Sequence, residues 1–441
     1  MKQSKHNIYY SPKEVRTILE RSIDVALDSL KCYCNDPVSD FTRCRKLPAR
    51  TLIECIMSFS NYSSIGELSH FFVGHGEMPS ASALSQRRQL LDPDIFKRIN
   101  NLFVSAFDDH TTINGYHILA QDGSDVNIPF MDDKTKTEKH DAKSFCQYHV
   151  NALYDCLNKV FYDWSIDAAS KKREVNALIS ILKDRNYPQN SIFTADRGYE
   201  SYNLMAHFIE NDIKFVIRVK DIHTRSGLMT NIKTEEGAFD IRVTRTLTSL
   251  QTKEIKADKE KYIFVPSTSN FDFLDENRDF YDLSFRAVRF KISEDTYETV
   301  VTNLSEEEFK TEDFKELYHY RWNEETAFNK LKYTIGLVYF HARKRKLIQQ
   351  EINAAFLMYN VSEVIIRNID LKKNKKPKLE YDYKPNFSSA VTNIRLYLRK
   401  KISMKELIHR IKKFLVGQRP ERSFERNIKG QSCKPLNYRT S

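Results

Sequence analysis

The spacing of hydrophobic and polar positions changes several times along the chain, and each change marks a different kind of structure. Residues 1–112 carry apolar side chains at helical intervals, which predicts a set of short helices. Residues 113–220 alternate between short apolar runs, which predict strands, and amphipathic runs, which predict helices. Such alternation is typical of an α/β domain.

Two further changes of pattern divide the rest of the chain. Residues 221–296 repeat Thr, Val, Arg and Lys in short segments, which predicts a β-rich insertion. Residues 297–367 return to the sheet and then become helical, and residues 368–441 form a basic C-terminal region. Within that region, 371–378 is expected to be a solvated linker. The tail 419–441 is expected to stay disordered until it meets a phosphate backbone.

Two of the apolar runs end in an aspartate, and a glycine follows that aspartate within two residues. The run 117–121 leads into Asp122, and the run 191–195 leads into Asp196. Both predict a buried strand that stops at an acid and a tight turn. Chemistry in α/β sheets usually lies at the carboxyl ends of strands, so both aspartates are candidates for a site. The alternative is that each aspartate only caps its turn.

A third candidate acid lies on a predicted helix that carries Tyr318, Arg321, Glu325 and Lys332. At about 100° per residue, these four side chains project within an arc of about 60°. A carboxylate between fixed cations suits a site that holds a metal ion and a phosphate. The neighbouring Glu324 is expected to point about 100° away, toward the apolar stripe. The alternative for Arg321 and Glu325 is an ordinary surface ion pair across one helical turn.

Asp122, Asp196 and Glu325 together form a set of oxygen ligands, which predicts a magnesium site. Hard divalent cations such as Mg²⁺ prefer carboxylate oxygens and bridge to phosphates. Two such ions about 4 Å apart, with Mn²⁺ as an alternative, can activate an attacking oxygen and stabilise a leaving one. Three nearby acids lack the strand-end position and are not chosen as ligands: Asp125, Asp155 and Asp163.

The composition narrows the class of partner. A net charge of +11 favours a polyanion, and together with the acidic residues it favours nucleic acid. The odd number of cysteines, seven, and the absence of an apolar signal core at the N-terminus favour reduced thiols in a cytosol. Cys32, Cys34 and Cys44 lack the spacing of a zinc site. No stretch is long and apolar enough to span a bilayer, so no membrane partner is expected.

The N-terminal helices are candidates for a DNA-reading unit. Ser80 follows Pro79 and is a plausible N-cap for a helix that carries Gln86, Arg87 and Arg88. If these three side chains are exposed, the region resembles a helix-turn-helix. The alternative is a helical bundle with a solvated polar face.

With these residues placed, the chain resembles the DDE (Asp-Asp-Glu) transposases of bacterial insertion sequences, in the family named after insertion sequence four. Asp122-Gly-Ser resembles the first acidic motif of that family, and Asp196-Arg-Gly-Tyr resembles the second. The resemblance covers roughly residues 115–365. The signature Tyr-x2-Arg-x3-Glu-x6-Lys is matched at every position, by Tyr318, Arg321, Glu325 and Lys332.

The resemblance implies an RNase H-like catalytic core with a β-rich insertion between the second Asp and the Glu, and helical regions at both ends. It implies metal-dependent cleavage of transposon ends and strand transfer into target DNA. Arg321 and Lys332 would grip terminal phosphates, and Tyr318 would support the same strand. The partners would be double-stranded DNA, as terminal inverted repeats and target, and a second copy of the chain in a synaptic complex. The setting would be the cytoplasm of a bacterium, at the nucleoid.

The resemblance leaves open the second-strand chemistry and the class of activity. Hairpin-forming relatives stack a displaced base on an aromatic ring in the insertion, where this chain has Glu298, so the neighbouring Tyr297 is the candidate. One alternative function is a structure-selective nuclease on the same fold, because a fold alone does not define an activity. Another is a non-catalytic DNA-binding repressor or domesticated relative.

Overall fold

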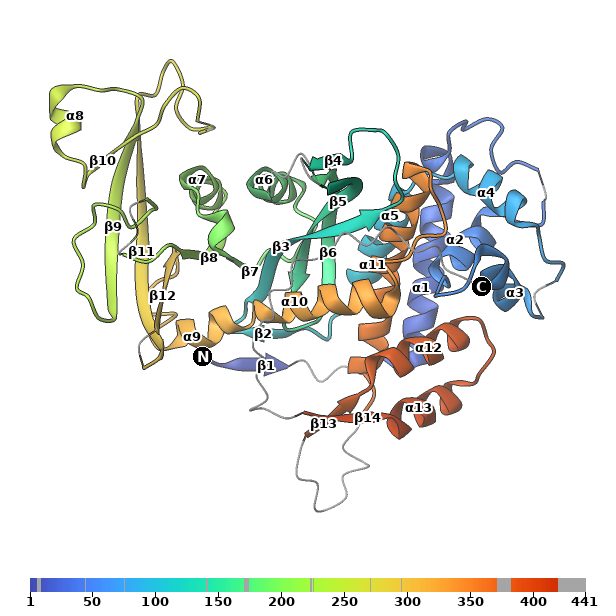
Figure 1. Cartoon of the computed structure of the whole chain (residues 1–441). Helices are drawn as coiled ribbons and strands as arrows, with labels where there is room; N and C mark the ends of the chain where they lie inside the picture. The colour runs from blue at the N-terminus through green and yellow to red at the C-terminus, as the bar shows by residue number, and fades with distance from the viewer. Residues whose placement is uncertain are drawn as a thin grey trace.

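The protein is described by a computed structural model with a central mixed sheet covered by helices (Figure 1). The predicted α/β organisation is therefore confirmed. The linker 371–378, the tail 419–441 and Cys44 lie outside the described residues. The structure describes residues 1–5, 9–43, 45–74, 76–139, 142–169, 174–222, 224, 226–269, 271–294, 296–370 and 382–418.

The N-terminal region is mainly helical, as predicted. Its elements are β1 (Gln3–Lys5), α1 (Pro12–Asp28), η1 (Leu30–Tyr33), α2 (Ala49–Met57), α3 (Ser64–Phe72), α4 (Ala81–Leu90), α5 (Asp94–Val104) and β2 (Thr111–Ile113). Ser80 is the N-cap of α4, where its side chain accepts a hydrogen bond from the Ala83 amide at 3.1 Å. Such a cap satisfies one of the amides that a helix start leaves without a partner.

The next part of the chain builds five core strands of the sheet. Its elements are β3 (His117–Ile128), β4 (Lys136–Lys139), β5 (Ala142–Asp155), β6 (Val160–Ala168), α6 (Glu174–Asp184), β7 (Ser191–Ala195), η3 (Arg197–Tyr199), α7 (Tyr202–Glu210) and β8 (Lys214–Val219). The core strands lie in the order β6-β5-β3-β7-β8. β5 is antiparallel to both β6 and β3, whereas β7 and β8 run parallel to β3.

The β-rich segment continues this sheet instead of forming a sheet of its own. It contains β9 (Phe239–Thr248), α8 (Lys253–Ala257), β10 (Tyr262–Phe264), β11 (Phe280–Ser293) and β12 (Thr296–Thr302). β12 pairs antiparallel with β8, from Thr299 opposite Val219 to Thr302 opposite Val216. β11, β9 and β10 then follow outward in that order. This segment is therefore joined to β8 through continuous backbone hydrogen bonding.

The last part of the chain is again helical. It comprises α9 (Asp313–His319), α10 (Trp322–Asn329), the π-helix η4 (Lys330–Ile335), α11 (Arg345–Arg367), β13 (Asp382–Pro385), α12 (Phe387–Leu398), α13 (Met404–Lys413) and β14 (Leu415–Gln418). Figure 1 shows α6 and α7 above the core strands and α10 below them. Among the described helices, none has the length and apolar character needed to cross a bilayer.

Helix α11 is buried along most of its length. It packs against α5, α2 and β6, so its polar side chains have partners inside the protein. The Asn360 amide donates to Asn100 at 2.7 Å, and Asn353 accepts from the Trp164 indole at 2.7 Å. Buried polar groups are tolerated when they are hydrogen-bonded, and these bonds hold the N-terminal helices and the sheet to one central helix.

Candidate active site

The pairing of β3 with β7 places Asp122 beside Asp196. The two parallel strands pair from His117 opposite Ser191 to Gln121 opposite Ala195. Asp122 and Asp196 are the next residues of each strand. Neighbouring strands lie about 4.8 Å apart, and paired positions of parallel strands face the same side of the sheet. The two carboxylates therefore start from adjacent points on one face.

The prediction that the strand stops at Asp122 is wrong, although β7 does end directly before Asp196. β3 continues to Ile128, with Asp122 opposite Ala152 of β5. The strand continues because β5 supplies hydrogen bonds on one edge after β7 has ended on the other. Gly123 is therefore not a turn glycine. A Cβ at this position would lie 2.6 Å from Cε1 of His149, closer than real contacts allow. The His149 ring therefore leaves no room for a side chain at position 123.

In each aspartate, one carboxyl oxygen accepts a hydrogen bond from a backbone amide one or two residues later in the chain. Oδ1 of Asp122 accepts from the Gly123 amide at 2.8 Å, and Oδ1 of Asp196 accepts from the Gly198 amide at 2.7 Å. The alternative of a local cap is thus realised at Asp196, which caps the turn after β7, whereas Asp122 bonds to the next amide of a strand that continues. Neither bond competes with ligand binding, because a carboxylate has a second oxygen, and a fixed first oxygen orients it.

The predicted signature helix is present but is not one regular helix. Tyr320 and Arg321 keep helical backbone angles between α9 and α10, and the Arg321 amide bonds to the Tyr318 carbonyl, three residues back, at 3.2 Å. The helix is therefore tightened at that point and widened into a π-helix at Lys332. Segments of π-helix are frequent at functional sites.

The structure brings the third acid within electrostatic reach of the first two. Burial raises the pKa of Asp122 to about 6, the Gly123 amide and Arg321 oppose that rise, and the charges of Asp196 and Glu325 add to it. Glu325 is partly exposed and lies 3.6 Å from Arg321 in an ion pair. Helix α10, which carries Glu325, packs directly on β3.

The three acids do not yet converge as metal ligands. Within the described ranges, no group of three or more His, Cys, Asp or Glu side chains has a geometry ready to hold a metal ion. The donor set nevertheless fits a hard divalent cation, because it consists of carboxylate oxygens that repel one another.

The predicted cations and the phenol lie around the same acids. Arg321 is almost fully buried, with its guanidinium carbon 5.5 Å from the Tyr318 ring centroid. Tyr318 is also buried, so it contacts a DNA strand only if the site opens. Burial lowers the pKa of Lys332, whereas the charges of Asp125 and Asp122 raise it, which places this ammonium beside the first acid.

Sequence reasoning missed a fourth carboxyl group, that of Glu324. Glu324 points inward, as expected, and its exposed fraction is 0%. It lies beside Asp122, however, and not among apolar side chains alone. Neither of its oxygens makes a hydrogen bond of good geometry among the described residues, although the backbone amide of Asp122 lies close enough to lower its pKa. Burial raises the pKa of Glu324 well above its usual value, and the charges of Asp122 and Asp196 raise it further. A glutamate at an otherwise apolar helical position was the available signal.

The prediction that α4 exposes Arg87 and Arg88 is wrong, whereas Gln86 is exposed. Arg87 donates to the Leu47 carbonyl at 3.1 Å. Arg88 lies 2.8 Å from Glu351 of α11. A guanidinium is tolerated inside a protein when it is paired and hydrogen-bonded, and the partner of Arg88 lies more than 250 residues away in sequence. These two arginines therefore hold α4 in place and are not available to DNA.

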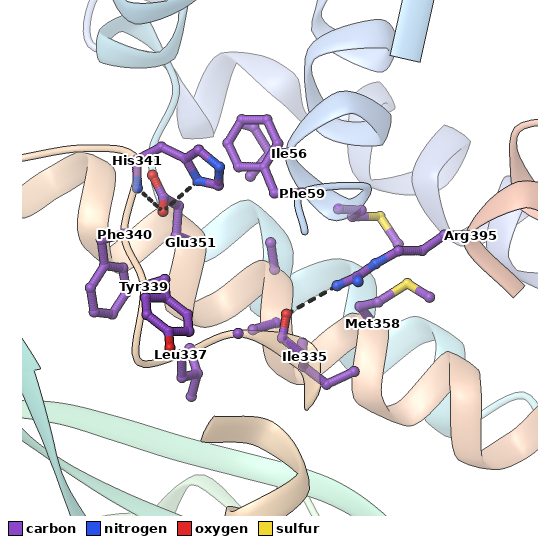
Figure 2. Close-up of a pocket in the computed structure, with 14 residues that line it drawn as sticks. Ile56, Phe59, Ile335, Leu337, Tyr339, Phe340, His341, Glu351, Met358 and Arg395 are labelled. Atoms are coloured by element: carbon purple, nitrogen blue, oxygen red, sulfur yellow. Dashed lines mark hydrogen bonds and ion pairs between the residues drawn. The ribbon is translucent and has the colours of Figure 1, made fainter. Parts of the chain in front are cut away.

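The same buried network holds the segment that follows the π-helix. Figure 2 shows His341 beside Glu351, with its ring Nδ1 3.2 Å from the carboxylate, and Arg395 donating to the Ile335 carbonyl at 3.0 Å. His341 also lies 3.3 Å from Glu67 of α3. The end of the signature helix is thus tied to the N-terminal helices and to α12.

Tyr297 does not face the pocket next to the signature helix. Its ring packs under Arg289, whose guanidinium carbon is 4.2 Å from the ring centroid. The pocket, of about 500 Å³, is lined instead by Glu298, Tyr318 and Trp322 among others. Successive residues of a strand point to opposite faces, so only one of Tyr297 and Glu298 can line it. Trp322, which is 40% exposed, is more accessible than the other aromatic side chains there, Phe290 and Tyr318, and sequence reasoning did not single it out.

Comparison with known proteins identifies the class of the chain. Residues 113–361 match the family model described as "Transposase DDE domain". This is more than half of the chain, which therefore belongs to that family. The protein is a DNA transposase, an enzyme that cuts DNA and transfers DNA strands.

Two further comparisons complete the picture. No curated protein matches the chain. Among solved structures, the chain is similar to the cryo-EM structure of a piggyBac transposase synaptic complex with hairpin DNA. The two sequences are 12% identical, with a TM-score of 0.44, and the match covers 96% of this chain and 90% of the other.

Proposed function

We propose that Asp122, Asp196 and Glu325 hold two divalent metal ions, Mg²⁺ or Mn²⁺, and that this site cleaves transposon ends and joins them to target DNA. The observation that carries the proposal is the position of Asp122 and Asp196 directly after the last register pair of β3 and β7, with Glu325 near enough to raise the pKa of Asp122. When bound, the two ions would supply an activated attacking oxygen and stabilisation for the leaving oxygen.

The residues around the acids have separate tasks in this proposal. Asp122 and Asp196, each fixed by one backbone hydrogen bond, present their second oxygens from the sheet. Arg321 and Lys332 bind phosphates of the terminal strand, because cations beside the acids are placed to neutralise a phosphodiester. Tyr318, which lines the pocket between α9 and the strands β11 and β12, supports that strand once its buried side chain becomes accessible.

A finer classification also belongs to the proposal. The four signature positions support membership of the insertion sequence four family, with a bacterial host and action at the nucleoid. The order β6-β5-β3-β7-β8 supports an RNase H-like core formed by 113–220 and 297–367. Residues 221–296 are the β-rich insertion, and residues 1–112 and 368–441 are the N-terminal and C-terminal regions that contact DNA.

The substrates would be two terminal inverted repeats and a target duplex, held by a homodimer in a synaptic complex. The test is incubation of the purified protein with Mg²⁺ and labelled DNA from the ends of the element that carries its gene. The proposal predicts a specific nick at the element boundary and, with a plasmid added, joined products. A second reaction supplies a pre-cleaved end with a free 3′-hydroxyl together with the plasmid. If the protein cuts the intact end but does not join the pre-cleaved end, it is instead a structure-selective nuclease.

A further inference from the structure

A buried histidine lies behind the two aspartates and contacts the backbone next to the first. His149 of β5 is 1% exposed. Its Nδ1 lies 2.7 Å from Oδ1 of Asp125, and its Nε2 lies 3.0 Å from Oε1 of Glu174 at the start of α6. The imidazole thus bridges two carboxylates from different elements of the core.

The two ends of this bridge lie next to Asp122 and Asp196. The ring is so close to Gly123 that a Cβ there would lie 2.6 Å from Cε1. On the other side, Oε2 of Glu174 would lie 3.5 Å from a Cβ at Gly198, two residues after Asp196. The Gly198 amide is the group that fixes Asp196. The bridge therefore contacts the strand at Gly123, next to Asp122, and the turn at Gly198, which holds Asp196.

The charge of the bridge suits this position. Burial alone would lower the pKa of His149, but the hydrogen bonds and charges of Asp125 and Glu174 outweigh it and raise the pKa to about 9. At neutral pH the bridge is a cation between two anions. Lys332 of the signature helix also lies near Asp125, so the network extends toward the helix that carries Glu325.

We propose that His149 is a positioning residue, which sets the spacing of Asp122 and Asp196 through the bridge Asp125–His149–Glu174. The inference rests on the proposed metal site, since it assigns His149 a role toward the two ligands that the sheet supplies. Residues that orient ligands from behind typically change metal affinity by about 10–100-fold when they are removed.

The same sheet contains a matched control. His117, on β3, also pairs with a buried carboxylate, with Nδ1 2.7 Å from Oδ2 of Asp155, but this pair lies at the opposite end of the strand. Both histidines are buried on core strands and both are paired with Asp. Replacing either one removes a buried hydrogen bond between a histidine and an aspartate, and of the two only His149 lies next to Asp122 and Asp196.

The test measures Mn²⁺ binding to the DNA-free protein by electron paramagnetic resonance, together with the Mg²⁺ concentration for half-maximal cleavage. His149→Gln is expected to weaken Mn²⁺ binding by about 10–100-fold and to shift the Mg²⁺ midpoint upward, with cleavage recovering at high metal. His117→Gln is expected to leave both metal readouts unchanged. Glu174→Gln, at a partly exposed helix start, serves if His149→Gln does not fold, and it is expected to shift Mn²⁺ binding in the same direction.

Two outcomes would overturn the inference, and they are distinguishable. Wild-type Mn²⁺ affinity in both His149→Gln and Glu174→Gln, with thermal stability reduced as in His117→Gln, would show a purely structural ion pair. Wild-type Mn²⁺ affinity in Asp122→Asn would overturn the proposed metal site itself.

Discussion

Gln121 of β3 lies opposite Ala195 of β7 in the last register pair between these two parallel strands. Because Asp122 and Asp196 follow directly, the sheet fixes the distance between their backbones. Glu325 lies on α10, a separate element that packs on β3 and holds its carboxylate toward Arg321. In the proposed metal site, two of the ligands are therefore fixed by the sheet, and the third comes from a separate helix.

Divalent metal should stabilise the protein against thermal unfolding, because it neutralises carboxylates that crowd around Asp122. A ligand that binds only the folded state at about 100 times its Kd contributes about 2.7 kcal/mol. Asp122→Asn should lose most of this Mg²⁺-dependent stabilisation. Asp163→Asn, which removes the partner of Lys97, should retain it. The comparison is made by calorimetry with and without a chelator, and an unchanged metal effect in Asp122→Asn would contradict the account.

Replacing Glu324 by leucine should stabilise the metal-free protein. The carboxyl group is fully buried, and among the described residues its oxygens make no hydrogen bond of good geometry, with the Asp122 amide only near them. An unsatisfied buried polar group costs about 1–3 kcal/mol, and a leucine of similar size removes that cost. Glu325→Leu, at a partly exposed position one residue along, is the control and should change stability much less. Urea unfolding measures both, and a large loss of stability in Glu324→Leu would show that the glutamate has an essential partner.

A methyl group at Gly123 should disturb both stability and cleavage. The added Cβ would displace the His149 ring, and overpacking of this kind costs about 1–3 kcal/mol. Gly237→Ala is the control, because a Cβ there has no neighbour within 4 Å. In a double-mutant cycle, Gly123→Ala should cost less when His149 is already alanine. Equal costs in the two backgrounds would mean that the ring does not limit the space at Gly123.

His149 should make stability depend on pH above neutrality. The folded state raises the pKa of its imidazole from 6.5 to about 9, so the folded protein binds the proton more tightly than the unfolded chain. The contribution to stability is fully present below pH 6.5 and is lost as the pH rises through about 9. Free energies of unfolding measured between these limits should fall more steeply in the wild type than in His149→Gln. Identical slopes would show that the imidazole is not charged in the folded protein.

Much of the core could be predicted from sequence because its signals are local. The run 191–195 gave a strand with the observed limits, since Asp196 ends it by capping the next turn. Ser80 gave the start of α4 for the same reason, a side chain that bonds to a nearby amide. The spacing of Arg321 and Glu325 allowed a surface ion pair as the alternative to a binding role, and the structure contains that pair with Arg321 buried.

The rest depended on contacts between distant parts of the chain. β3 continues past Asp122 because it pairs with β5. The next residue, Gly123, has no room for a side chain because the ring of His149, on β5, lies against it. Arg88 is buried because Glu351 lies opposite it, a relationship that no local pattern contains. The π-helix around Lys332 could not be predicted either, because the sequence pattern was interpreted with the geometry of a regular α-helix.

The most direct test of the central claim is Mg²⁺-dependent cleavage of the element's own ends by Glu325→Gln, compared with Glu324→Gln and with the wild type. The account predicts that Glu325→Gln still binds the DNA but cuts it at least about 1,000-fold more slowly, as is common when a catalytic group is removed. Glu324→Gln should retain much more activity. Cleavage by Glu325→Gln at the wild-type rate would contradict the claim that this glutamate completes the site with Asp122 and Asp196.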